Sequence, residues 1–127
     1  MDESHHPNIT VLIVDDYEDA RYTTRLALEH YGYRILETDN GESAVEIATR
    51  ERPNIILMDV SLPGLDGLAA TERIRHDEQM RGTVIVALTA HHESQYRAKA
   101  LAAGCNAYVT KPIDFEWLNN LLLNLLP

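Results

Sequence analysis

Residues 55–59 read Ile55-Ile56-Leu57-Met58-Asp59, four apolar residues followed by one carboxylate, and residues 60–64 after them are rich in turn formers. An apolar run of this length bounded by turn residues predicts a buried strand, as in a parallel sheet. Asp59 would then lie at the carboxyl end of that strand. Ligands bind at this edge of open α/β sheets, so Asp59 is a candidate functional residue.

Four other segments have the same strand character, and the apolar positions between them follow a helical period. The predicted strands are 9–14, 33–37, 55–59, 83–88 and 107–110, and the predicted helices are 20–31, 41–50, 66 to the break at Gly82, 92–103 and 114–125. Such alternation implies right-handed crossovers and a parallel sheet with helices on both faces. We expect one α/β domain over 9–127, preceded by a flexible leader over 1–8 and followed by no second domain.

Composition excludes several classes of function. The chain has 127 residues, a hydrophobic fraction of 45 % and a net charge of −9, which opposes a nucleic-acid surface. No apolar run approaches the roughly 20 residues of a membrane span, and residues 1–7 lack a signal-peptide core. We therefore predict a cytoplasmic protein that binds neither membrane nor nucleic acid. Cys105 is expected to be a small buried or half-buried residue, and His5-His6 a tail without metal.

Polar residues of particular types follow four of the predicted strands. They are Asp15-Asp16, Asp59, Thr89 and Lys111, and in a parallel sheet they meet at one edge. Carboxylates ~4 Å apart repel by about 4 kcal/mol at an effective dielectric of 20, so such a cluster indicates a bound cation. Oxygen ligands suit Mg²⁺, and a carboxylate can accept a phosphoryl group. Lys111 would supply positive charge and Thr89 a hydroxyl donor, so the pattern indicates Mg²⁺-assisted phosphoryl transfer to Asp59.

Structural interpretations compete with this functional one. Asp15-Asp16 taken alone would also suit a helix N-terminus, and Thr89 would suit an ordinary N-cap. Trp117 and Leu123 fall off the main apolar stripe of the last helix. They either extend the core contact or form an apolar partner patch.

Several short motifs contain or follow the strand-end residues. In chain order they are Val14-Asp15-Asp16, Leu57-Met58-Asp59, Leu62-Pro63-Gly64-Leu65-Asp66-Gly67, Leu88-Thr89-Ala90, Gly104-Cys105-Asn106-Ala107-Tyr108 and Lys111-Pro112. With all of them at this spacing, the chain closely resembles the receiver domains of bacterial response regulators over essentially its full length. The resemblance implies a flavodoxin-like (βα)5 fold with strand order 2-1-3-4-5.

The resemblance also implies roles for individual residues. Asp59 would be phosphorylated, and Asp16 would ligate Mg²⁺ directly, with Asp15 acting directly or through water. The backbone carbonyl of Ser61 would be a further metal ligand. Lys111 would bind the phosphoryl group, and its bond to the following proline is usually cis in this fold.

Thr89 and Tyr108 match the switch pair of the family. A phosphoryl group adds about −1.5 to −2 charge and three acceptor oxygens, so Thr89 would move in to donate to it. The ring of Tyr108 would then turn into the vacated space and change the face formed by helix 92–103, strand 107–110 and helix 114–125. We expect the alanine-rich helix 92–103 to shift.

The implied function is a phosphorylation-activated switch of a two-component phosphorelay. The donor would be a histidine kinase or histidine phosphotransfer protein, and the changed face would bind a downstream effector or a second copy. Such a domain catalyses its own phosphorylation and dephosphorylation and is otherwise not an enzyme. Ser61 and His91 would modulate phosphoryl loss, or merely face solvent.

Two other classes of protein also fit part of this pattern. A haloacid-dehalogenase-type phosphatase also forms an aspartyl phosphate with Mg²⁺, but it carries its nucleophile in an Asp-x-Asp arrangement after the first strand. Here Asp16 is followed by Tyr17-Glu18. A flavin carrier of the same fold would need a phosphate-cradling loop after the first strand, which this chain lacks.

Overall fold

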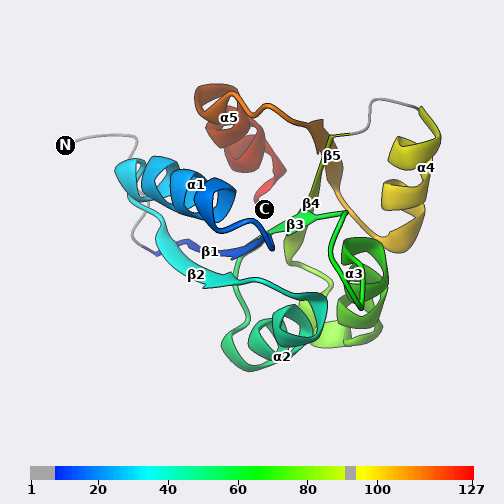
Figure 1. The fold of residues 1–127 in the computed structure, drawn as a ribbon. Coiled ribbons are helices and arrows are strands. Elements are labelled where there is room, and N and C mark those ends of the chain that lie inside the picture. Colours follow the sequence, from blue (N-terminus) through cyan, green and yellow to red (C-terminus); the bar gives the residue numbers. More distant parts are fainter. Residues whose placement is uncertain (1–7, 91–93) are drawn as a thin grey trace.

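The computed structural model describes residues 8–90 and 94–127, in which strands and helices alternate along the chain (Figure 1). In order they are β1 (Thr10–Val14), α1 (Glu18–His30), β2 (Arg34–Thr38), α2 (Gly41–Glu51), β3 (Ile55–Asp59), α3 (Gly67–His76), the short 3-10 helix η1 (Glu78–Met80), β4 (Val84–Thr89), α4 (Ser94–Ala103), β5 (Ala107–Thr110) and α5 (Phe115–Leu125). The leader up to residue 7, with His5 and His6, and the candidate His91 lie outside the described residues.

The five strands form one parallel sheet in the order β2-β1-β3-β4-β5, as the resemblance predicted. Figure 1 shows α1 and α5 on one face of the sheet and α2 and α3 on the other, with α4 beside the β5 end. The predicted α/β class and the two covered faces are confirmed.

Each face of the sheet has its own apolar core, because successive strand residues point to opposite sides. Leu12, Ile56 and Met58 pack with alanines of α2, α3 and α4. Val11, Ile13, Ile55, Leu57 and Val86 pack with Leu28 of α1 and with Leu118 and Leu122 of α5. Every residue of β3 is buried, so the predicted buried strand over 55–59 is confirmed.

Three helices begin directly after a capping side chain. The side chains of Asn40, Asp66 and Asp114 accept hydrogen bonds from the backbone N–H groups of Ser43, Ala69 and Trp117. Each such cap contributes about 1 kcal/mol. These caps set where α2, α3 and α5 start relative to the strands before them.

The third helix is shorter than predicted. It ends at His76, and Asp77 has an extended backbone (φ −82°, ψ 115°) and caps η1 through Gln79 N–H. Beyond the break, Arg75 donates to the Met80 carbonyl over 2.7 Å, a contact that helical periodicity does not reveal. The expectation of one helix up to Gly82 is therefore wrong.

The remaining structural predictions concern single side chains. Cys105 is buried, as expected, and Trp117 and Leu123 are exposed, so these two do not extend the core. Among the described side chains of α4, the buried ones are the alanines Ala100 and Ala103. Across the described residues, the structure contains no helix with the length and apolar character that a membrane span needs.

Candidate functional site

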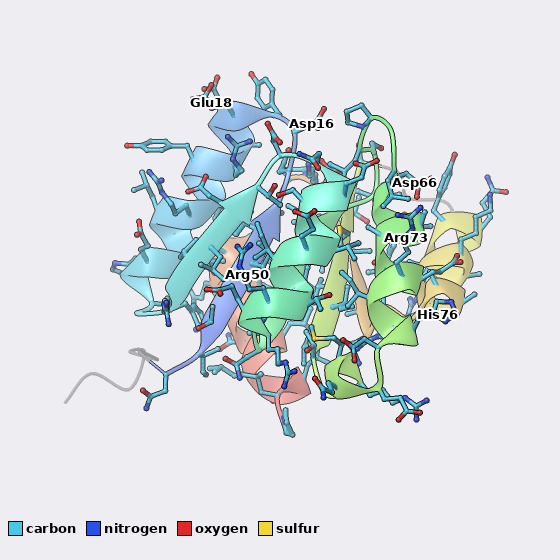
Figure 2. All side chains as sticks on the ribbon, turned by 90° about the horizontal axis from the view of Figure 1, so that it is seen from below. Asp16, Glu18, Arg50, Asp66, Arg73 and His76 are labelled. Carbon is cyan, nitrogen blue, oxygen red and sulfur yellow. The ribbon has the colours of Figure 1, made fainter. Side chains whose placement is uncertain are left out.

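Asp15, Asp16 and Asp59 come together at the carboxyl edge of the sheet. Val14 of β1 is in register with Met58 of β3, so the aspartates that follow these two residues are neighbours. One carboxylate oxygen from each of the three lies within 4.8 Å of the others. Asp15 and Asp59 are buried, whereas Asp16 is exposed and lies at the loop edge near the start of α1 (Figure 2).

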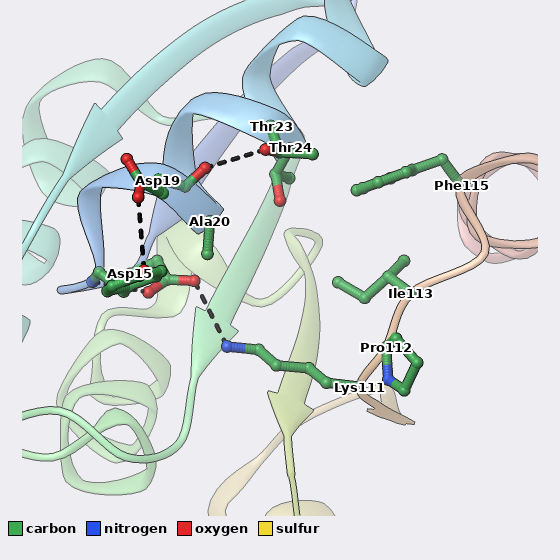
Figure 3. A pocket seen from close by; sticks show the side chains of 10 residues that line it. Asp15, Asp19, Ala20, Thr23, Thr24, Lys111, Pro112, Ile113 and Phe115 are labelled. Carbon is green, nitrogen blue, oxygen red and sulfur yellow. Dashed lines mark hydrogen bonds and ion pairs between the residues drawn. The ribbon is translucent and has the colours of Figure 1, made fainter.

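Lys111 reaches into this cluster from the end of β5. Its Nζ lies 3.2 Å from Asp59 Oδ2 and 3.4 Å from Asp15 Oδ2. Figure 3 shows the contact with Asp15 along one wall of the pocket. The bond between Lys111 and Pro112 is cis, as expected. The sequence placed Lys111 at this edge, and the structure shows that one ammonium group contacts two carboxylates.

The two buried aspartates are held in the same way. Asp15 Oδ1 accepts the N–H of Tyr17 and Asp59 Oδ1 accepts the N–H of Ser61, both over 2.9 Å. One oxygen of each carboxylate therefore orders the loop that follows it, while the other faces Lys111. Ser61 itself is exposed.

Charge balance in the cluster favours a cation. Burial raises the pKa of the Asp15 carboxyl group, the Tyr17 N–H and Lys111 oppose this rise, and the charge of Asp59 adds to it. Burial opposes the charge of Lys111, but Asp59 and Asp15 outweigh burial and raise the Lys111 pKa. Three carboxylates and one ammonium group leave two negative charges uncompensated. An all-oxygen donor set with that charge fits a hard divalent cation such as Mg²⁺.

The predicted switch residues occupy the neighbouring strands. Thr89 is the last residue of β4 and is buried, and Tyr108 of β5 is half-buried on the α4 side of the sheet. The backbone N–H of Lys111 donates to the Thr89 carbonyl over 2.7 Å. The backbone thus connects Thr89 directly to the residue that contacts Asp59.

A cleft of about 420 Å³ opens beside the cluster, between the start of α1 and the loop from β5 to α5. Asp15 and Lys111 form its polar wall, and Ala20, Ile113 and Phe115 line its apolar part (Figure 3). Sequence reasoning missed this cleft. The sequence gives no separate signal for it, because Ile113 and Phe115 also pack against the core with Leu118 and Leu122.

Fold and site together define a class of protein: a doubly wound α/β domain with an acidic, lysine-bridged pocket at the carboxyl edge of its sheet. The family model described as "Response regulator receiver domain" matches residues 11–123. The chain belongs to this family. Receiver domains are the phosphorylation-activated signalling switches of two-component systems and are not classical enzymes, so the predicted class of function is confirmed.

Individual relatives support the membership of this chain in the receiver-domain family. The chain is 32 % identical to Protein PilH of Pseudomonas aeruginosa, over 85 % of this chain and 89 % of PilH. It is 36 % identical to the polar-differentiation response regulator DivK of Brucella anthropi, over 83 % and 85 % of the two chains. The crystal structure of the receiver domain of sensor histidine kinase PA1611 from P. aeruginosa superposes with a TM-score of 0.85 at 37 % identity, covering 91 % of this chain and 95 % of that one. That structure is described with a magnesium ion coordinated in its active site cleft.

Proposed function

We propose that Asp59 is the phosphorylated residue of this receiver domain and that Asp15, Asp16, Asp59 and the Ser61 carbonyl hold Mg²⁺. The observation that carries the proposal is the position of the Lys111 ammonium group, 3.2 Å from Asp59 and 3.4 Å from Asp15. This geometry places a cation where the oxygens of a phosphoryl group on Asp59 would need compensation. The magnesium ion in the PA1611 receiver domain supports the same assignment of the metal.

The transfer step uses few protein groups. A carboxylate oxygen of Asp59 attacks phosphorus of a phosphohistidine, and the P–N bond breaks with its electron pair leaving on the imidazole. Lys111 faces the transferred oxygens, while Ser61 N–H and Lys111 hold the carboxylate in place before attack. Mg²⁺, when bound, neutralises charge on the phosphoryl group. Attack by water on the acyl phosphate returns the free carboxylate and inorganic phosphate.

Phosphorylation would be transmitted through Thr89 and Tyr108. The Thr89 side chain is expected to donate to a phosphoryl oxygen, and the half-buried Tyr108 ring to move inward. The face formed by α4, β5 and α5 would change as a result. Among the described side chains of α4, the buried ones are Ala100 and Ala103, so we expect its displacement to expose little apolar surface.

Several finer assignments belong to the same proposal. The phosphodonor is a histidine kinase or a histidine phosphotransfer protein, and the changed face binds a downstream effector or a second copy of the chain. Ser61 and His91 are proposed to modulate phosphoryl loss. A cytoplasmic location suits the single cysteine, and a domain over 9–127 with a leader over 1–8 remains a prediction.

Labelling with a small phosphodonor tests the assignment. Incubation with acetyl phosphate and Mg²⁺ should give an acid-stable, base-labile adduct on the wild-type protein and none on Asp59→Asn. Asp66→Asn, which changes a helix-capping carboxylate outside the acidic cluster, should label normally. Equal labelling of Asp59→Asn would disprove the role of Asp59. Sustained multiple-turnover release of phosphate from small esters would instead favour the phosphatase rival.

A further inference from the structure

Arg21, in the first turns of α1, makes two contacts at once. Its Nη1 donates to the backbone carbonyl of Asp15 over 2.8 Å, and its Nε donates to Glu37 Oε1 over 3.0 Å. The side chain is only 18 % exposed, so both contacts are largely shielded from water. Arg21 therefore joins β2, α1 and the acidic loop, although β2 places no residue in the cluster itself.

Arg25 provides a natural comparison with Arg21. Its Nη1 donates to the other oxygen of the same carboxylate, Glu37 Oε2, over 2.8 Å. Within the residues that the structure describes, the Arg25 ion pairs are with Glu37 and Glu29 and do not include Asp15. The two arginines thus share a partner and a charge, but only Arg21 binds the backbone of the acidic loop.

The Asp15 backbone is consequently held from both sides. Its N–H donates to the Thr38 carbonyl over 3.2 Å, and its carbonyl accepts from Arg21. That carbonyl belongs to the peptide unit joining Asp15 to Asp16, and a peptide unit is planar. Fixing the carbonyl therefore fixes the direction in which the chain enters Asp16, a residue of irregular backbone with an exposed side chain.

We propose that Arg21 is a positioning residue for the metal site, holding the Asp15–Asp16 peptide so that the Asp16 carboxylate faces the acidic cluster. The inference rests on the proposed Mg²⁺ site. Arg21 touches neither a ligand oxygen nor the phosphoryl acceptor, and it acts through the backbone of Asp15. Groups that orient metal ligands in this way commonly affect metal affinity by 10–100-fold.

Repulsion between the Arg21 charge and Mg²⁺ would change the Mg²⁺ affinity in the opposite direction. A guanidinium close to the cluster repels Mg²⁺, so loss of the charge alone would strengthen binding. Pairing with Glu37 reduces this repulsion. The direction of the affinity change therefore separates positioning from simple electrostatics.

A magnesium titration of four proteins tests the proposal. Four proteins are titrated with MgCl2: wild type, Arg21→Met, Arg21→Gln and the matched control Arg25→Met. Binding is followed by the backbone amide NMR signals of Asp16 and Ser61, and thermal unfolding is measured in parallel. Both Arg21 variants should bind Mg²⁺ about tenfold more weakly. Arg25→Met, which loses the same charge and a Glu37 partner, should remain within about twofold of wild type, because the Arg25 side chain is more exposed than Arg21 and its charge is more strongly screened. Arg21→Gln decides the question if Arg21→Met does not fold.

The outcomes distinguish this inference from the proposed function. Unchanged or tighter Mg²⁺ binding by the Arg21 variants, with saturable binding by wild type, overturns the positioning role alone. An equal loss in Arg25→Met also overturns it, because Glu37 pairing or general stability would then explain the effect. Absence of saturable shifts in wild type would overturn the metal site and this inference together.

Discussion

Lys111 controls the charge of the acidic cluster, and its two carboxylate contacts predict opposite effects on metal binding and phosphorylation. Lys111→Met keeps most of the apolar stem but removes a cation next to Asp15 and Asp59. We expect Mg²⁺ to bind about fivefold more tightly, because a competing positive charge is lost, and phosphoryl labelling of Asp59 to become slower. Both are measured on one preparation by MgCl2 titration and by labelling with acetyl phosphate.

Lys99→Met is the matched control for that experiment. Lys99 is an exposed residue of α4 whose ammonium group lies over the Tyr96 ring, away from the cluster. Lys99→Met should change neither the Mg²⁺ affinity nor the rate of phosphoryl labelling of Asp59. Weaker Mg²⁺ binding by Lys111→Met would mean that Lys111 organises the carboxylates rather than competing with the metal.

Tyr33 predicts an alkaline limit to stability. Its hydroxyl donates to Asn119 Oδ1 of α5 inside the protein, and burial raises the Tyr33 pKa to about 12 from its usual 10.0. Because the folded-state pKa is the higher one, stability from this group is complete below pH 10. It is lost as the pH rises through about 12, by roughly 2–3 kcal/mol. Urea unfolding at a series of pH values measures this loss.

Tyr33→Phe tests the assignment of that loss. The variant should be less stable at neutral pH by about 1–2 kcal/mol, because Asn119 Oδ1 loses its donor in a buried place. It should also lose less stability between pH 10 and 12 than wild type, since it has no hydroxyl to ionise there. Equal alkaline losses in the two proteins would assign the effect to other groups.

At the scale of elements, the start of α3 controls the position of Asp59. A Cβ added at Gly67 would lie 2.1 Å from the Asp59 carbonyl oxygen, so Gly67→Ala must push α3 away from β3. We expect a loss of about 1–3 kcal/mol in unfolding free energy and weaker Mg²⁺ binding. Gly82→Ala is the control, because a Cβ there meets nothing within 4 Å, and its effect should stay within about 0.5 kcal/mol. Equal stability of the two variants would show that α3 accommodates the methyl group without strain.

The helices and strands also show which features could be predicted from the sequence alone and which could not. The strand ends that carry Asp15, Asp59, Thr89 and Lys111 were predictable, because burial and turn chemistry are local signals. The lysine bridge was only implied by a shared edge, since its distances depend on how strand ends twist and stagger. The contacts of Arg75 with Met80, just beyond the end of α3, and of Arg21 with Asp15 are made by long side chains to backbone carbonyls outside their own helices. Periodicity carries no information about such contacts.

At the scale of the whole molecule, the helices differ in how much apolar surface packs them against the sheet. On the α1 and α5 face, Leu28, Leu118 and Leu122 are fully buried. Close to β5 on the other face, the buried residues among the described side chains of α4 are Ala100 and Ala103, which bury much less apolar area. We therefore propose that a change at Asp59 is transmitted along β4 and β5 toward α4.

Thr89 lies on that route, and a pair of substitutions there tests whether its hydroxyl transmits phosphorylation. Thr89→Ala should still be labelled at Asp59, because the Lys111 N–H bonds to the Thr89 backbone carbonyl, which the substitution leaves in place. The changes in backbone amide NMR signals of Leu101 and Tyr108 on phosphorylation should be largely lost in Thr89→Ala and retained in Thr89→Ser, which keeps the hydroxyl donor. If Thr89→Ala transmits the change as wild type does, the signal travels through Lys111 and the β5–α5 loop. If Thr89→Ser fails as completely as Thr89→Ala, the methyl group and its packing in β4, rather than the hydroxyl, couple Asp59 to α4.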